Sequence, residues 1–250
     1  MNTRFSQSNV LLRLLLVMTI VLLTGAASED LILKVGDFSK AEGDSPLVDG
    51  WEVLTLGKND RTHYHLIEHE GVKVVRAMSN NAVSGLRKEV NLDPEKYHTL
   101  KWRWKVSNVL QGGDVTRKKG DDFAARVFIT FEYDKKKLSL QERIKHSTLR
   151  LLGYGNTPLR SLNYIWANKA PAGTMVSSPY TDLVKMIAVR DNAAHLNTWH
   201  TEEQNIYEDY EAAFGEKPGR IKDIVIMTDT DNTGEAAMAY FGDIVFTQMR

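Results

Sequence analysis

Hydrophobic and polar residues alternate along much of this chain with the period of two that is typical of β-strands. The clearest case is the run Leu-Lys-Trp-Arg-Trp-Lys-Val that begins at position 100. Because successive side chains of a strand point to opposite faces, this run predicts a half-buried strand. We expect Trp102 and Trp104 to face a core, and Lys101, Arg103 and Lys105 to face outward.

Further strands are expected wherever a short apolar or alternating run is bounded by turn residues. These runs lie at 31–35, 51–56, 62–68, 72–78, 82–90, 123–133, 161–167 and 184–190, and on both sides of an acidic loop at 229–234. Glu70-Gly71 predicts a tight hairpin. Helical spacing of apolar residues predicts helices at Leu138–Leu152 and Asn205–Phe214, the second ended by Gly215. Since no strand–helix–strand rhythm is present, the pattern predicts an all-β antiparallel sandwich with two short helical insertions.

Residues 1–28 have the plan of a secretory signal peptide. Arg4 and Arg13 supply a basic segment, Leu14–Leu23 is uncharged and apolar, and small residues follow up to Ser28. We expect cleavage directly before or directly after Ser28. Residues 29–250 are then expected to form a single β-sandwich domain that is periplasmic or secreted and has no membrane span. The alternative is an uncleaved anchor, but the apolar run has about 10 residues and a span needs roughly 20.

Composition narrows the classes of function. Lys and Arg together number 32, as do Asp and Glu, so the chain lacks the concentrated positive charge that nucleic-acid binding requires. It has no cysteine, which excludes disulfides, thiolate metal sites and a cysteine nucleophile. The sequence also contains no phosphate-binding loop, no G-x-S-x-G elbow and no H-E-x-x-H helix.

Acidic and amide side chains gather in the loop between the last two expected strands. Asp229, Asp231 and Asn232 bring oxygen atoms that can converge on a hard cation such as calcium, or on the hydroxyl groups of a polyol. An EF-hand is excluded, because Tyr240 stands where its bidentate glutamate would be. The alternative is a turn in which these side chains bind their own backbone.

A second polar cluster precedes the strand expected at 123–133. Asp121 and Asp122 are adjacent carboxylates that repel each other and need a compensating partner, and Arg126 stands four positions beyond Asp122. A bidentate pair with Arg126 would be a structural buttress, or the three side chains would orient a ligand. We expect this cluster and the acidic loop to form one site at one end of the sandwich, since both contain polar groups that are costly to bury unpaired.

The expected strand at 161–167 has an aromatic face. Tyr164 and Trp166 offer rings on which a sugar can stack, and Asn163 offers an amide for its hydroxyl groups. The alternative is an ordinary aromatic core. His63 and His65 share a strand face and provide at most half of a zinc site, with exposed strand histidines as the alternative.

Several motifs together resemble the bacterial domain of unknown function 3047 family. They are Trp102-Arg-Trp104, Gly120-Asp-Asp-Phe-Ala-Ala-Arg-Val127, Asn163-Tyr-Ile-Trp166, Asp209-Tyr210 with Phe214-Gly215, and Thr228-Asp-Thr-Asp-Asn-Thr-Gly234 with Ala239-Tyr-Phe-Gly-Asp-Ile244. The resemblance covers nearly all of the chain after the leader. It implies an exported domain similar to galactose-binding-like jelly rolls, and it carries no catalytic residue over to this chain. Calcium is frequent in such relatives, so the resemblance adds Asp243 to Asp229 and Asp231 as candidate cation ligands.

Three hypotheses for function follow. The first is a non-catalytic protein that binds carbohydrate or envelope glycan, with Tyr164 and Trp166 stacking on the sugar and the polar clusters binding its hydroxyl groups. The second is a glycan-active hydrolase or lyase on the same sandwich, whose acid and base are carboxylates of the two clusters. The third is a structural subunit of the cell envelope, in which the polar motifs only stabilise loops. An enzyme would depolymerise a glycan, a binding protein would only be retained on it, and a structural subunit would do neither.

Overall fold

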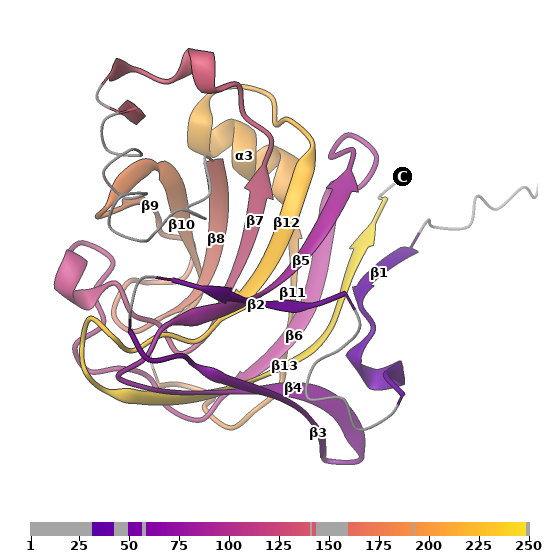
Figure 1. Ribbon diagram of the computed structural model, residues 1–250, viewed down its shortest axis with the longest axis vertical. Coiled ribbons are helices and arrows are strands. Elements are labelled where there is room, and N and C mark those ends of the chain that lie inside the picture. Colours follow the sequence, from indigo (N-terminus) through magenta and orange to yellow (C-terminus); the bar gives the residue numbers. More distant parts are fainter. Residues whose placement is uncertain are drawn as a thin grey trace, which may run out of the picture. The chain divides into compact units, whose positions relative to one another are not determined.

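The computed structural model describes residues 32–42, 50–56, 59–140, 142–143, 160–191 and 193–248. These residues form two β-sheets (Figure 1). A hydrophobic core between the sheets contains side chains from both. The expectation of a mostly β, two-sheet protein is confirmed. In the part of the chain that the structure describes, no helix is long and apolar enough to cross a bilayer.

The first sheet has six strands. Their spatial order is β11 (His200–Asn205), β6 (Thr99–Val106), β13 (Ala236–Thr247), β4 (Val72–Asn80) and β3 (His63–His69), and β1 (Ile32–Gly36) pairs with the second half of β13. All of these pairs are antiparallel. The expected hairpin joins β3 to β4: Glu70 and Gly71 have φ angles of 54° and 77°, and a tight type I′ turn requires positive φ at both positions.

The second sheet has seven strands. Their order is β2 (Glu52–Thr55), β5 (Ser84–Leu92), β12 (Ile221–Met227), β7 (Arg126–Phe131), β8 (Arg160–Ala167), β10 (Thr181–Asp191) and β9 (Met175–Ser178). β8 and β10 run parallel, so the expectation of a wholly antiparallel sandwich was wrong. A parallel pair needs a crossover, and β9, which the sequence did not predict, lies on that connection and pairs with β10 at the sheet edge.

Helices add little to this framework. α3 (Ile206–Phe214) confirms the second expected helix: the side chain of Asn205 accepts hydrogen bonds from two backbone N–H groups of its first turn, and Gly215 ends it with a φ of 70°. Three 3-10 turns are also present: η1 (Phe38–Lys40), η2 (Lys118–Gly120) and η3 (Lys135–Lys137). The other expected helix, Leu138–Leu152, falls largely outside the described residues, as does the expected signal peptide.

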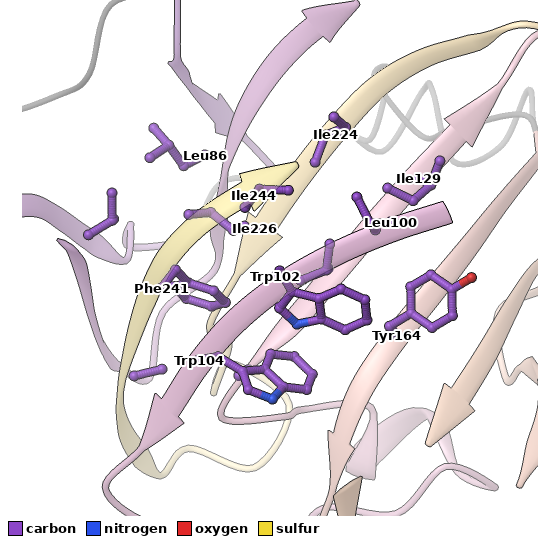
Figure 2. Packing of buried hydrophobic residues seen from close by; sticks show 14 of the residues in the cluster. Leu86, Leu100, Trp102, Trp104, Ile129, Tyr164, Ile224, Ile226, Phe241 and Ile244 are labelled. Carbon is purple, nitrogen blue, oxygen red and sulfur yellow. The ribbon is translucent and has the colours of Figure 1, made fainter. Parts of the chain in front are cut away.

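The core is built around a group of aromatic rings. Trp102 and Trp104 are buried, as predicted, with ring centroids 5.4 Å apart in a T-shaped arrangement. Trp102 also packs against Tyr164 of the opposite sheet, at a centroid distance of 5.3 Å (Figure 2). Aliphatic and aromatic side chains from both sheets surround these rings, among them Leu86, Leu100, Ile129, Ile224, Ile226, Phe241 and Ile244. The two tryptophans therefore determine which face of β6 meets the second sheet.

One of the three cations expected on the surface is buried. Lys101 and Arg103 are partly exposed, whereas Lys105 is only 5% exposed. The Lys105 ammonium donates a hydrogen bond to Glu70 Oε1 at 2.7 Å and lies 2.6 Å from His69 Nε2. Lys105 does point away from the core, as the alternation predicts. Its burial comes from the end of the β3–β4 hairpin, which no pattern along β6 reveals.

Candidate functional site

The two acidic segments meet where β7 begins and β12 ends. Asp121 and Asp122 lie just before β7, and Asp229 and Asp231 lie in the loop after β12. One carboxylate oxygen from each of Asp122, Asp229 and Asp231 lies within 4.8 Å of the others. The structure thus brings together the two clusters that the sequence placed at strand ends, and their role in binding stays a prediction.

Arg126 links the buried parts of both clusters. Its Nε donates to Asp229 Oδ1 at 2.8 Å, its Nη2 lies 2.6 Å from Asp229 Oδ2, and its Nη1 donates to Asp121 Oδ1 at 3.1 Å. The guanidinium also lies over the ring of Phe123, 4.4 Å from its centre. Arg126 is therefore a structural buttress, but its partners are Asp229 and Asp121 instead of Asp122. Asp122 and Arg126 do not share a strand face as the even spacing between them would suggest, because β7 begins only at Arg126 and the residues before it are not in a strand.

Asp122 organises the loop after β12 from a fully buried position. Its Oδ2 accepts hydrogen bonds from the backbone N–H and the hydroxyl of Thr233, at 2.7 and 2.8 Å, and its Oδ1 accepts from the amide of Asn232 at 3.0 Å. Thr230 anchors the same loop, because its hydroxyl shares a 2.8 Å hydrogen bond with that of Ser79. The loop is thus held mainly by groups outside it, and less by its own side chains.

The site contains more carboxylates than cationic groups, and this excess changes their pKa values. Burial raises the pKa of Asp229 well above its ordinary value; Arg126 opposes this rise, and the neighbouring carboxylates add to it. Burial also raises the pKa of Asp121 and of Asp231, and repulsion from Asp122 contributes in both cases. For Arg126, burial by itself would lower the pKa, but Asp229 and Asp121 raise it. Four carboxylates facing one guanidinium favour the uptake of a proton or a cation.

The accessible part of the site is formed by Asn59, Lys118, Tyr180, Asp231 and Asn232, which we call the rim. Asp231 Oδ2 accepts a hydrogen bond from the amide of Asn59 at 2.7 Å, and Asn232 Oδ1 accepts one from the Tyr180 hydroxyl at 2.7 Å. The Tyr180 side chain is 36% exposed, and the Lys118 ammonium lies 5.3 Å from the centre of its ring.

Sequence reasoning missed three residues of the rim: Asn59, Tyr180 and Lys118, the last of which lies in η2. Asn59 precedes β3 and Tyr180 lies in the turn between β9 and β10, so each is more than 50 positions from Asp231. Asn59 adjoins Asp60 in a polar turn, which is a weak signal for a site. No spacing or motif connects Tyr180 with the acidic loop, since β9 itself was not predicted.

The same carboxylates are the candidate metal ligands. Within the described ranges, Asp122, Asp229 and Asp231 are the one group of three or more side chains suited to hold an ion. Carboxylate oxygens suit calcium or magnesium, although those of Asp122 and Asp229 already accept hydrogen bonds. Asp243 does not belong to this group: its carboxylate accepts from the backbone N–H and the hydroxyl of Ser39, at 2.8 and 2.6 Å. Asp243 lies in the second half of β13, beside the pairing with β1, and the acidic loop adjoins the first half.

Tyr164, Trp166 and Asn163 lie apart from the rim. Both rings are fully buried between the sheets, so neither offers a free face to a sugar. The Tyr164 hydroxyl donates to Asp209 Oδ2 of α3 at 2.7 Å. Asn163 is 1% exposed on the other face of β8, and in the part of the chain that the structure describes neither its amide nitrogen nor its amide oxygen has a hydrogen-bond partner. These residues follow the alternative of an ordinary core, because β8 lies between β7 and β10 and is covered on both faces.

The fold and the site define a two-sheet β-sandwich with a polar site at strand ends. The chain belongs to a protein family of unknown function, DUF3047, whose family model matches residues 49–245. The family resemblance of the motifs is therefore confirmed. Among curated proteins, none matches this sequence.

Several solved structures are similar to this chain at low identity. The family 30 carbohydrate-binding module of a cellulosomal cellulase from Clostridium thermocellum has a TM-score of 0.41 and 11% identity, over 87% of this chain and 98% of that one. Endoglucanase 3 of family GH12 from Trichoderma harzianum has a TM-score of 0.42 and 6% identity, over 90% and 100%. The xylan-binding module CBM15 has a TM-score of 0.35 and 10% identity, over 89% and 99%. Because these values are low, the function proposed below rests on the residues of the site.

Proposed function

We propose that this protein is exported and binds a glycan, or a ligand with similar hydroxyl groups, at the rim, without catalysis. The observation that carries this proposal is the convergence of the Asp231 carboxylate, the amides of Asn59 and Asn232 and the exposed ring of Tyr180. Carboxylate and amide groups hydrogen-bond hydroxyl groups, and an aromatic ring packs against the apolar face of a sugar. Arg126 and Asp122 support the rim from below, which keeps its geometry fixed.

Burial of the other carboxylates favours binding over hydrolysis. Glycoside hydrolysis uses two carboxyl groups that flank the scissile bond. Asp122 and Asp229 are 0% and 4% exposed, and Asp121 is 8% exposed and paired with Arg126. Asp231 is the one carboxylate of the four that is more than marginally exposed. A hydrolase or lyase would need a second accessible carboxyl group beside Asp231. If the protein were a purely structural subunit, the rim would bind no ligand.

A divalent cation is a second candidate ligand of the same cluster. The excess of carboxylates over guanidinium groups favours it, and calcium would enter beside Asp231, which is open to solvent. A ligand that binds only the folded state stabilises it by mass action. We therefore expect a chelator to lower the melting temperature of the native protein and to have no such effect on Asp231→Ala. An unchanged melting temperature after chelation would contradict cation binding. It would not contradict glycan binding.

Glycan binding is tested with the mature protein and a panel of neutral oligosaccharides and polysaccharides. We expect saturable binding by calorimetry and no release of reducing ends. Tyr180→Ala should weaken binding by about twofold to tenfold, because a stacked ring contributes roughly 0.5–1.5 kcal/mol. Tyr207→Ala is the matched control, since Tyr207 lies on α3, and it should bind normally. Release of shorter products would establish the enzyme alternative, and no binding to any glycan would overturn the proposal.

A further inference from the structure

One row of outward-facing side chains crosses the first sheet on the side opposite the core. Tyr240 of β13 is paired in register with Lys105 on one side and with Arg76 on the other, and Arg76 is paired with His65 of β3. Trp199 extends the row beyond β6, because it precedes His200, which pairs with Trp104. Aromatic and cationic side chains therefore alternate along this row, none of which belongs to the rim.

The sheet curls so that this outer face is concave. Neighbouring strands lie about 4.8 Å apart, so β11 and β3, four steps apart, would be separated by roughly 19 Å in a flat sheet. Yet Trp199 Nε1, at the β11 edge, donates a 2.8 Å hydrogen bond to Glu70 Oε2 in the β3–β4 turn. His69, next to that turn, stacks on Tyr240 with ring centroids 4.3 Å apart. The hairpin must therefore bend over the outer face, which also accounts for the burial of Lys105.

Trp199 is held in a fixed orientation on this face. Its indole N–H is occupied by Glu70, and the guanidinium carbon of Arg103 lies 4.7 Å from the centre of its ring. Gly242 makes room for Arg103, because a Cβ at that position would come within 2.3 Å of Arg103 Nε. A ring that is already immobilised loses little conformational entropy when a ligand stacks on it.

Two guanidinium groups on this face have no anionic partner. Lys101 pairs with Glu203 and Lys105 with Glu70, but Arg76 and Arg103 form no ion pair with any described residue. Arg76 Nε is moreover buried and has no hydrogen-bond partner among the described residues, which is an unfavourable state for a charged donor. In the pairing register their positions are two strands and two residues apart. The face thus presents two separate sites for anions beside a partly exposed tryptophan.

We propose that this concave face binds a carboxylate-bearing polysaccharide, independently of the rim. Arg76 and Arg103 would each pair with a carboxylate of the polymer, since a guanidinium binds a carboxylate bidentately. Trp199, which lies beyond Arg103 at the β11 edge of the sheet, would stack on a further sugar ring of the polymer. A single-stranded nucleic acid would also bring anions and flat rings, but the balanced charge of the chain disfavours a phosphate polymer.

The test measures binding of the mature protein to polygalacturonate, to neutral galactan of similar length and to an oligothymidylate. We expect binding to polygalacturonate alone, weakened by added salt because the pairs are partly exposed. Arg76→Gln and Arg103→Gln should each weaken it about tenfold, as expected for loss of one charge-assisted pair. Trp199→Phe, which keeps a ring, should weaken it less than Trp199→Ala.

Two controls separate this surface from general charge effects and from the rim. Lys222→Gln removes one positive charge from the second sheet, and Asp231→Asn changes the rim; both should bind polygalacturonate like the unaltered protein. Three results would each overturn the proposal. They are binding of oligothymidylate as tight as that of polygalacturonate, binding of polygalacturonate by the two arginine variants as tight as by the unaltered protein, and no binding of polygalacturonate at all. None of these results bears on the proposal that neutral glycans bind at the rim, which is tested separately with Tyr180→Ala.

Discussion

At the scale of single residues, Arg126 is central to the buried part of the site. It is 4% exposed and contacts the carboxylates of Asp121 and Asp229, which are themselves buried. A buried ion pair adds little net stability in general, but removal of one partner leaves an uncompensated buried charge. Arg126 is therefore important because its removal would leave buried carboxylates without a cationic partner.

We predict that Arg126→Gln lowers the free energy of unfolding by about 3–5 kcal/mol at pH 7. Urea unfolding of the variant and of the unaltered protein measures this difference. It should shrink at pH 4, because protonation of the two carboxylates removes the unpaired charge. Arg117→Gln is the control: Arg117 pairs with Asp114 at an exposed position and should change stability by less than about 1 kcal/mol. Equal effects of the two substitutions would contradict the buttress.

Asp231 gives a prediction whose sign depends on pH. Burial, and then Asp122, raise its pKa above the ordinary value of 3.8, so the folded protein holds this proton more tightly than the unfolded chain does. Its contribution to stability is therefore fully present below about pH 4 and is lost as pH rises through the raised pKa. Asp231→Asn, which imitates the protonated form, should raise the melting temperature at pH 7 in chelator and leave it unchanged at pH 3. The rise should be modest, because solvent screens a partly exposed carboxylate.

A lower melting temperature of Asp231→Asn at pH 7 in chelator would show that the carboxylate is stabilising in its charged form. The same substitution in calcium provides an internal comparison. If the cluster binds calcium, the unaltered protein gains stability that the variant cannot gain, so the sign of the difference between them reverses.

At the scale of elements, α3 shows how local sequence fixes a boundary. The Asn205 side chain accepts from the N–H groups of Tyr207 and Glu208, both at 3.2 Å, and Gly215 takes the left-handed conformation that ends the helix. Tyr210 is buried on this helix and packs on Phe131 with ring centroids 4.6 Å apart. Capping and packing therefore act together to seat α3 against the sandwich.

We predict that Asn205→Ala lowers the free energy of unfolding by about 1 kcal/mol, because two N–H groups of the first turn lose their acceptor. Asn205→Ser keeps an oxygen acceptor and should lie close to the unaltered protein. Chemical denaturation of the three proteins is the measurement. Equal loss in both variants would mean that Asn205, the last residue of β11, acts through its strand pairing with Thr99 of β6, and not as a cap.

At the scale of the whole molecule, the two surfaces proposed to bind ligands differ in charge. The rim adjoins the acidic cluster of Asp122, Asp229 and Asp231, whereas the concave face of the first sheet carries Arg76, Lys101, Arg103 and Lys105 against Glu70 and Glu203. Over the whole chain, acidic and basic residues are nevertheless equal in number. Net charge alone therefore conceals the local fields that a ligand would encounter.

We predict that the protein isolated from its native source begins at Ser28 or Glu29 and is found outside the cytoplasm. The reason is the order of a basic segment, an apolar run of about 10 residues and small residues before Glu29. Mass spectrometry of the intact protein measures its N-terminus. An intact Met1, or retention in the inner membrane, would instead indicate an uncleaved anchor.

The sequence by itself determined the features that arise from neighbouring residues. Alternation along β6 predicted the burial of Trp102 and Trp104, Glu70-Gly71 predicted the hairpin, and helical spacing of apolar residues with Gly215 predicted α3. Each of these follows from the geometry of one strand, one turn or one helix. The meeting of the two acidic clusters was also predictable, since buried carboxylates need partners and both clusters stand at strand ends.

Only the tertiary structure decided which elements lie side by side. Packing of β8 against β6 of the first sheet covers Tyr164 and Trp166, so that two residues expected to stack on a sugar became part of the core. Folding also brought Tyr180 to the rim and bent the β3–β4 hairpin over Lys105. The physical reason is that the period of two reports which residues share a face of a strand, while exposure depends on neighbours that are distant in sequence.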